Sequence, residues 1–386
     1  GDLTVLFNGE IYNSIENNLK DGANIIPAIM RDDERFTTLL DGEFAIAAYQ
    51  SQKKIVTLAT DPFGTKPLYF SMNNDGIIIS SYASAIIMCN MKPRRVASNT
   101  LIKIDYHNKI IQCVKHNDIW QKTKKTSLDE WCHYFDESMN KRIVSTNKEI
   151  YFGLSGGYDS GIISCYLAKK EAKSRAISVL NKDELYTQLE RLRYFKDVNL
   201  LSWSNEMEKA AKSYALKNIE ELQCIEYSTG SNYYSNKPMI EDSGFKKLIH
   251  VAAIGERNGC KVFIDGMGGD EIYSDYGWNG KRLGIHSNFG GLFPNDIFTI
   301  IPKNPYNKRA RWASFYNSTM QTYLSKSEHV IGSFGHESRY PLLDKKLVNT
   351  FINLPAEVKN ENYKAPLGYY MEKYDWPMMK EVKHGF

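Results

Sequence analysis

The pattern of apolar residues changes near residue 120, and this change limits the fold more than any other feature of the sequence. Before it, short β-rich runs such as LTVLF (3–7) and EFAIAAY (43–49) alternate with turn-forming residues. After it, strand-like runs alternate with helical patterns, as where EIYFGL (149–154) leads to YDSGIISCYLAKKEA (158–172). The first pattern predicts an antiparallel sheet, and the second predicts a parallel sheet covered by helices on both faces.

The length of the chain agrees with two domains, because 386 residues exceed the usual size of a single hydrophobic core. A polar stretch without periodicity, residues 115–127, is typical of a linker. We therefore expect a β-rich domain at residues 1–120 and an α/β domain at residues 121–386. From about residue 298 the chain lacks strand alternation, which predicts that the second domain has a helical C-terminal part.

Charge and cysteine content exclude several classes of partner. The 49 basic and 45 acidic residues leave a formal net charge of +4, too small and dispersed for a nucleic-acid or membrane-surface protein. The six cysteines lie far apart and show no metal-ligand spacing, which predicts reduced thiols in a cytoplasmic protein. No stretch reaches the roughly 18 to 20 apolar residues that span a bilayer. We expect small-molecule partners, and a homodimer is compatible with the sequence.

The hexapeptide SGGYDS (155–160) stands where a strand gives way to a helix. Its glycines let the backbone approach an anion closely, its hydroxyls and amides donate hydrogen bonds, and the helix N-terminus adds partial positive charge. The lysine of a Walker loop is absent. The segment predicts a phosphate site, with a glycine turn in which Asp159 or Ser160 only caps the helix as the alternative.

This hexapeptide resembles the SGGxDS signature of the ATP pyrophosphatases, enzymes that release pyrophosphate and leave AMP on the substrate. DGMGGDE (265–271) resembles the second signature of asparagine synthetases, and RYPLLD (339–344) is similar to their R-x-P-F-L-D segment. Tyr363-Lys364 is similar to the element that precedes their last helices.

The first half carries the same resemblance. FNGEIYN (7–13) and DPFGTKPLY (61–69) resemble class II glutamine amidotransferase segments of the same family. All these motifs occur in the family's order and span nearly the whole chain. The chain is thus identified as a member of the asparagine synthetase family, with an amidotransferase-like domain followed by an ATP-pyrophosphatase domain.

The resemblance implies an AMP-forming ligase that uses ATP and Mg²⁺ to join a small carboxylate to ammonia derived from glutamine. The residues it implies for ATP and pyrophosphate are Ser155, Gly156, Gly157, Asp159, Ser160, Leu180 and Gly268. Asp159 and Asp270 are the implied Mg²⁺ ligands, and Lys364 is the implied catalytic cation. Considered alone, Asp270 also suits a cap of the following helix, Leu180 also suits a position in the core, and Lys364 also suits a solvated surface.

The resemblance breaks at position 267. Asparagine synthetases carry glutamate there and β-lactam synthetases carry tyrosine, whereas this chain has Met267. A thioether cannot accept a proton from an amine. Asp265, where asparagine synthetases have serine, is the catalytic candidate that could replace this carboxylate, and asparagine as the product is in doubt.

The amidotransferase half departs from its family at position 1. Class II amidotransferases use an N-terminal cysteine as nucleophile, and position 1 here is Gly. The implied glutamine-site residues are nevertheless present as Asn8, Gly9, Glu10 and Asp21. We expect that an N-terminal part with the cysteine precedes this sequence. The alternative is a relic domain, as in β-lactam synthetases.

Three functions are therefore compatible with the sequence. The first is amidation of a carboxylate with glutamine or ammonia, and the second is intramolecular amide closure of the β-lactam synthetase type. The third is a non-catalytic paralogue that acts as a binding partner, which Met267 suggests. Binding alone would not require the segment 155–160 and Asp270, which weighs against the third function, and a cysteine upstream of this sequence would separate the first function, which leads, from the second.

Overall fold

The computed structural model describes residues 2–13, 25–31, 34–116, 119–121, 123, 125–227, 234–273, 315–316, 319–359 and 361–379. The chain forms two compact units, Gly1–Gln121 and Lys122–Phe386. None of the described helices is long and apolar enough to cross a lipid bilayer.

The described residues of the first unit form two antiparallel sheets; the alternating pattern predicted antiparallel pairing but not the division into two sheets. The larger sheet has the strand order β1-β2-β3-β7-β8, and the smaller has the order β5-β4-β6. The larger sheet comprises β1 (Leu3–Ile11), β2 (Gly42–Gln50), β3 (Ile55–Thr60), β7 (Thr100–Asp105) and β8 (Ile110–Lys115). The other elements are β4 (Tyr69–Met72), β5 (Ile77–Ser80), β6 (Arg94–Arg95), α1 (Ile25–Met30), α2 (Phe36–Leu39) and α3 (Ala83–Ile87).

Strand β2 shows why this unit has two apolar layers. Its residues are almost all buried, because successive side chains enter different cores. Phe44 and Ile46 pack with residues of β1, α1 and α2. Ala45 and Ala47 face the opposite side and pack with residues of β3, β4 and β7. The nearly continuous apolar run at 44–48 is therefore a central strand that is covered on both faces.

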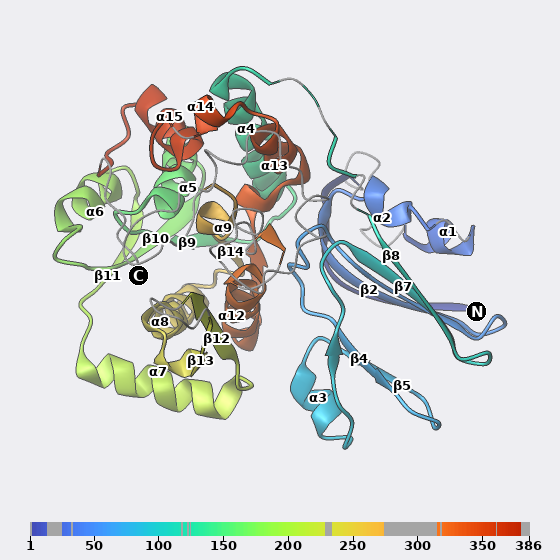
Figure 1. Cartoon of the computed structure of the whole chain (residues 1–386). Coiled ribbons are helices and arrows are strands. Elements are labelled where there is room, and N and C mark those ends of the chain that lie inside the picture. The colour runs from blue at the N-terminus through green and yellow to red at the C-terminus, as the bar shows by residue number, and fades with distance from the viewer. Residues whose placement is uncertain are drawn as a thin grey trace. The chain divides into compact units, whose positions relative to one another are not determined.

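The second unit is built on a parallel sheet with the order β11-β10-β9-β14-β15. Figure 1 shows helices on both sides of this sheet, with α4, α5 and α15 on one side and α7, α8 and α12 on the other. The strands are β9 (Ile150–Gly153), β10 (Ser174–Val179), β11 (Asp197–Leu201), β14 (Val262–Ile264) and β15 (Glu337–Arg339). The predicted α/β class is confirmed.

The helices that follow or cover these strands vary in length from one turn to several turns. Within the described residues they are α4 (Leu128–Val144), α5 (Tyr158–Lys169), α6 (Leu185–Leu192), α7 (Asn205–Asn218), α8 (Ser243–Arg257), α9 (Gly269–Tyr273), α12 (Thr319–Ser333), α13 (Lys345–Ile352), α14 (Ala356–Lys359) and α15 (Ala365–Lys373). The described part of the C-terminal region is mainly helical, as expected, whereas residues 298–314 of that region lie outside the described residues.

The strand order reverses between β9 and β14. The chain passes outward from β9 to β10 and β11, and then returns to place β14 on the other side of β9. Loops at such a reversal diverge and leave a crevice at the carboxyl ends of the strands, where ligands of open α/β sheets bind. Strand β15 and the antiparallel hairpin of β12 (Gln223–Tyr227) and β13 (Tyr234–Pro238) were not predicted from the sequence.

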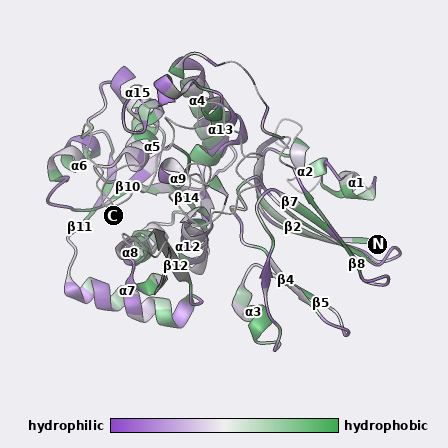
Figure 2. Cartoon of the chain, viewed as in Figure 1, coloured by the Kyte–Doolittle hydropathy of each residue, from purple (hydrophilic) through white to green (hydrophobic). Residues whose placement is uncertain are grey.

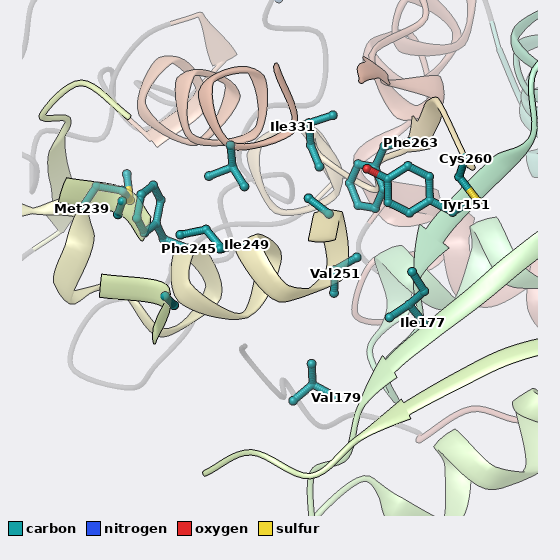
Figure 3. Packing of buried hydrophobic residues seen from close by; sticks show 14 residues of the cluster. Tyr151, Ile177, Val179, Met239, Phe245, Ile249, Val251, Cys260, Phe263 and Ile331 are labelled. Atoms are coloured by element: carbon teal, nitrogen blue, oxygen red, sulfur yellow. The ribbon is translucent and has the colours of Figure 1, made fainter. Parts of the chain in front are cut away.

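One face of the parallel sheet packs on a continuous apolar cluster. Figure 3 shows Tyr151, Ile177 and Phe263 of the strands facing side chains of α8 such as Val251. The rings of Tyr151 and Phe263 lie 5.0 Å apart between centroids. Helix α7 contributes only small buried residues to this cluster, and Figure 2 shows hydrophilic colour along much of its length. The apolar face of the sheet thus fixes α8 beside the carboxyl ends of β9 and β10.

A buried charge cluster holds the C-terminal helices to α4. The Asp344 carboxylate caps α13 by accepting hydrogen bonds from the backbone of Lys346 and Leu347, at 2.9 and 3.3 Å. It also pairs with Lys141, and with Arg142 at 3.3 Å, both from α4. Burial alone would raise the pKa of Asp344, but these two cations hold that pKa well below its usual range.

We expect Asp344→Asn to lower the free energy of unfolding at pH 7 by about 3 to 5 kcal/mol, because it leaves buried cations without their partner. A carboxyl whose pKa is depressed in the folded state stabilises the protein above its unfolded pKa, about 3.9, and loses that contribution as the pH falls below it. The acid-induced loss of stability should therefore be smaller in the variant. Urea unfolding between pH 7 and pH 3 measures both effects. Equal free energies of unfolding of variant and wild type at pH 7 would contradict the first effect, and equal losses between pH 7 and pH 3 would contradict the second.

Candidate active site

The two glycine-rich motifs meet at the reversal of strand order. Ile264 of β14 pairs with Phe152 of β9, so the two strands end at nearly the same level. The loop 154–157 follows β9 and leads into α5, and the loop 265–268 follows β14 and leads into α9. Segments more than a hundred residues apart in the sequence are therefore neighbours at the edge of the sheet, as expected for strand-end residues.

The loop after β9 is closed by its own hydroxyl groups. The Ser155 and Ser160 hydroxyl oxygens lie 2.8 Å apart, and the Ser155 amide donates to Ser160 Oγ at 3.1 Å. The Gly157 amide donates to Ser155 Oγ at 3.2 Å. Helix α5 begins immediately afterwards at Tyr158, so the amides of its first turn have no acceptor within the helix. The arrangement suits an anion at the start of α5.

A buried acid and a buried arginine, which the sequence analysis missed, support this loop. The Gly156 amide donates to Glu184 Oε2 at 2.6 Å, and a Cβ at position 156 would lie only 2.8 Å from Cβ of Glu184. Arg191 Nη1 donates to the carbonyl oxygens of Ser155 and Gly157, at 2.6 and 2.8 Å. Burial lowers the pKa of Arg191 to about 10, which still leaves it charged at neutral pH.

Glu184 and Arg191 leave one weak signal in the sequence. Glu184 is the N-cap residue of α6 and Arg191 lies in the last turn of that helix, seven residues or about two turns later. Charged residues two turns apart are common on exposed helices, and the spacing alone does not show that both are buried.

The loop after β14 packs directly against Asp159. A Cβ at position 269 would lie 2.0 Å from Asp159 Oδ1, so only glycine permits this approach. Gly268 has φ +100° and its amide donates to Glu271 Oε2 at 3.1 Å. The glycines of this motif thus allow the two loops to come into contact.

The ammonium group of Lys364 joins the two acidic residues of these loops. Its Nζ lies 2.5 Å from Asp159 Oδ1 and 3.0 Å from Asp270 Oδ1. Burial by itself would lower the pKa of Lys364, but the two carboxylates outweigh it and keep the pKa above its ordinary value. Lys364 is therefore a charged, buried residue and not a solvated surface lysine. The hydroxyl of Tyr363 donates to Asp270 Oδ1 at 3.4 Å.

Asp265 and Met267 lie on the same loop but have different surroundings. Asp265 Oδ1 accepts the Met267 amide at 3.1 Å, and Oδ2 accepts the Ser327 hydroxyl at 2.5 Å. Both residues line a cavity of about 350 Å³ at the carboxyl ends of β9, β10 and β14. The Asp265 carboxylate is thus held in place beside the cavity.

The same cavity is lined by four of the ten residues predicted for the synthetase domain, whereas Ser155, Gly156, Gly157, Gly268 and Lys364 are not among its described lining residues. Its charged lining includes Asp159, Asp265 and Asp270, and Ser160 also lines it. Leu180 is not among the described residues that line the cavity. On β10 the apolar lining of the cavity comes from Ile177 and Val179, which precede Leu180 in the sequence.

Two lysines on the helical wall of the cavity were also missed by the sequence analysis. Lys247 belongs to α8 and Lys326 to α12. Lys326 Nζ lies 3.9 Å from Asp242 Oδ1, and its side chain is 15% exposed. Burial lowers the pKa of Lys247, and Glu184 and Asp242 oppose this shift. Neither lysine belongs to a motif that could have marked it.

The predicted glutamine-site residues lie in the first unit. Asn8, Gly9 and Glu10 are consecutive on β1 and pair with Ala45, Phe44 and Glu43 of β2. Gly9 has φ +123°, and a Cβ there would lie 1.8 Å from the Glu43 carbonyl oxygen. This position therefore requires glycine. Asp21 lies outside the described residues.

Comparison with known proteins gives matches to both halves of the chain. Residues 1–141 match the family model of a glutamine amidotransferase domain. A Methanocaldococcus jannaschii protein described as a glutamine-hydrolysing asparagine synthetase is 25% identical over 91% of this chain and 64% of its own length. Asparagine synthetase 2 of Bacillus subtilis is 21% identical over 94% of this chain and 58% of its own length. The chain thus spans about three fifths of the length of these relatives.

Solved structures resemble the chain more distantly. An NH₃-dependent NAD synthetase from Campylobacter jejuni matches 67% of this chain and 100% of its own, with 12% identity and a TM-score of 0.28.

Residues 130–314 and 302–377, more than half of the chain, match the asparagine synthase family model. This protein therefore belongs to the asparagine synthase family.

Proposed function

We propose that this protein is an ATP-dependent amide ligase that adenylates a small carboxylate and transfers the acyl group to ammonia from glutamine. The observation that carries the proposal is the contact of Lys364 with Asp159 and Asp270 beside the phosphate loop. We assign residues 1–120 to the glutamine amidotransferase-like domain and residues 121–386 to the synthetase domain.

Adenylation solves a leaving-group problem. A carboxylate is a poor acyl donor because oxide is a poor leaving group, whereas an acyl-adenylate releases AMP. In the proposed first step a carboxylate oxygen of the substrate attacks the α-phosphorus of ATP, and the bond from that phosphorus to the bridging oxygen of pyrophosphate breaks. Negative charge increases on the departing pyrophosphate, where the first turn of α5, Ser155 and Ser160 would hold it.

The acidic residues suit a hard divalent cation that is shared with phosphates. Mg²⁺ prefers oxygen ligands and is usually bound through one or two carboxylates together with substrate phosphates. Asp159 and Asp270 fit this pattern, since both line the cavity and their side chains are 28% and 25% exposed. When bound there, Mg²⁺ would neutralise phosphate charge, and Lys364 would stabilise charge on the reacting phosphates.

In the proposed second step ammonia attacks the acyl carbon, AMP leaves and a proton must be removed from the nitrogen. Met267 cannot accept that proton. Asp265 is the carboxylate nearest to Met267 along the chain, and it lines the same cavity. We propose Asp265 as the proton acceptor, oriented by the Met267 amide and the Ser327 hydroxyl.

Ammonia would come from glutamine bound in the first unit. The match to a glutamine amidotransferase domain supports this source. We propose that Asn8 and Gly9 supply oxyanion donors and that Glu10 and Asp21 bind glutamine. The position of Gly9, which has no room for a side chain, is consistent with a backbone donor.

Incubation with ATP, Mg²⁺, ammonium and a panel of small carboxylic acids should yield AMP and pyrophosphate. Asp159→Asn and Asp270→Asn should each lower turnover by on the order of 10² or more, because each removes a carboxylate that would hold Mg²⁺ against the phosphates. Asp129→Asn, at an exposed ion pair with Lys373, is the matched control and should keep normal turnover. Chromatography of the nucleotides measures the products, and formation of ADP and orthophosphate would refute the assignment.

Glu184→Ala should weaken ATP binding by about tenfold or more, because it removes the charged acceptor of the Gly156 amide. Glu184→Gln keeps a neutral acceptor, so its affinity for ATP should lie between those of Glu184→Ala and the wild type. Glu190→Ala, on the same helix in an ion pair with Arg193, is the control. Calorimetric titration with ATP and a thermal melt separate binding from stability. Unchanged ATP affinity in a folded Glu184→Ala protein would show that the loop does not need this acid.

Asp265→Asn should separate the two steps. The amide preserves the shape of the side chain but accepts a proton poorly, so amide formation should fall by about 10² or more. Exchange of labelled pyrophosphate into ATP, which reports adenylation alone, should change much less. The assay uses the carboxylic acid from the panel that best supports AMP formation. Equal losses in both reactions would assign Asp265 a structural role in the loop.

A further inference from the structure

We infer that Lys364 is a built-in counter-ion that closes the acidic pair Asp159 and Asp270 to free divalent cations, so that a metal enters only together with nucleotide phosphates. The nucleotide part of this inference rests on the proposed function. The closing of the carboxylate pair rests on geometry alone.

The position of the ammonium group supports this role. Lys364 Nζ contacts one oxygen of each carboxylate, at 2.5 and 3.0 Å, and so lies between the two groups that would have to share a metal ion. The lysine side chain is 3% exposed, whereas the two aspartate side chains are 28% and 25% exposed. Both aspartates line the cavity, and Lys364 is not among the described residues that do so. The cation is therefore buried while the carboxylates remain accessible.

The backbone presents Lys364 in a fixed position. It has φ 46° and ψ 50°, the left-handed conformation that residues other than glycine seldom adopt. It stands immediately before α15, and its carbonyl oxygen accepts the amides of Leu367 and Gly368 at 2.8 and 3.1 Å. The preceding Tyr363 packs edge-on against Tyr158 of α5, with ring centroids 5.2 Å apart. An unusual conformation held by neighbours on both sides indicates that the lysine is positioned by the fold.

The ammonium group makes the acidic pair a weaker site for a free divalent cation. Among these three groups Lys364 lowers the charge offered to a cation from −2 to −1, and a cation shared by the two carboxylates would have to displace the ammonium group that lies between them. Among the residues that the structure describes, no group of three or more histidine, cysteine, aspartate or glutamate side chains is placed to hold a metal ion. A polyphosphate would supply the missing oxygen ligands and negative charge, so metal and nucleotide should bind together.

Mn²⁺, observed by electron paramagnetic resonance, provides a direct test that does not depend on turnover. Without nucleotide, the wild-type protein should leave Mn²⁺ free, and Lys364→Met should bind one Mn²⁺ at least about tenfold more tightly. Lys364→Gln, also neutral but polar, should behave like Lys364→Met and serves if the methionine variant does not fold. Lys373→Met, which removes an exposed lysine of α15 from its pair with Asp129, should match the wild type.

Two further measurements locate the site. Adding Asp159→Asn to Lys364→Met should abolish the new Mn²⁺ binding, and α,β-methylene-ATP should allow the wild-type protein to bind Mn²⁺. Nucleotide-free Mn²⁺ binding of equal strength in wild type and Lys364→Gln would overturn the inference. Failure of the wild type to bind the ATP analogue would instead contradict the proposed function, because the comparison made without nucleotide would still report on Lys364.

Discussion

The pairing of β9 with β14 is the constraint on which the site depends. These strands come from segments more than a hundred residues apart, and their register aligns Phe152 with Ile264. Because both strands end at this level, the two glycine-rich loops begin side by side. A shift of one residue in this register would reverse which side chains of β14 face the apolar cluster of Figure 3. The same hydrophobic packing that stabilises the sheet therefore also sets the spacing of the two loops.

The loops are then joined by charge. Asp159 approaches Gly269 too closely for any side chain there, and Lys364 contacts Asp159 and Asp270 together. Beneath the first loop, Arg191 binds two of its carbonyl oxygens while Glu184 accepts one of its amides. Four separate parts of the chain, at residues 159, 184–191, 270 and 364, thus contribute fixed charges to one small region. Such prearranged charges are what phosphate chemistry needs, since little reorganisation is then required during reaction.

The sequence predicted the antiparallel first unit and the parallel sheet of the second unit well because most of their strands are apolar runs bounded by turn residues. It missed β15, whose residues Glu337–Arg339 form no apolar run, and the β12–β13 pair, whose pairing depends on its place in the fold. Asp159 and Asp270 lie in recognisable motifs, so their convergence could be expected. No motif marks the other charged residues of the region, because their role depends on burial and on neighbours from other elements. These residues are Glu184, Arg191, Lys247 and Lys326. At β10 the cavity lining comes from Ile177 and Val179, and the sequence alone does not decide which residue of a buried strand reaches a ligand.

A structure of the protein with α,β-methylene-ATP and Mn²⁺ would show whether the two glycine-rich loops hold the phosphates and the metal ion. The analogue cannot be cleaved between its α- and β-phosphates, and Mn²⁺ can be located by its anomalous scattering. We expect the β- and γ-phosphates at the start of α5, beside Ser155 and Ser160, and Mn²⁺ between these phosphates and the carboxylates of Asp159 and Asp270. Phosphates bound away from this loop, or a metal that contacts neither aspartate, would contradict this expectation.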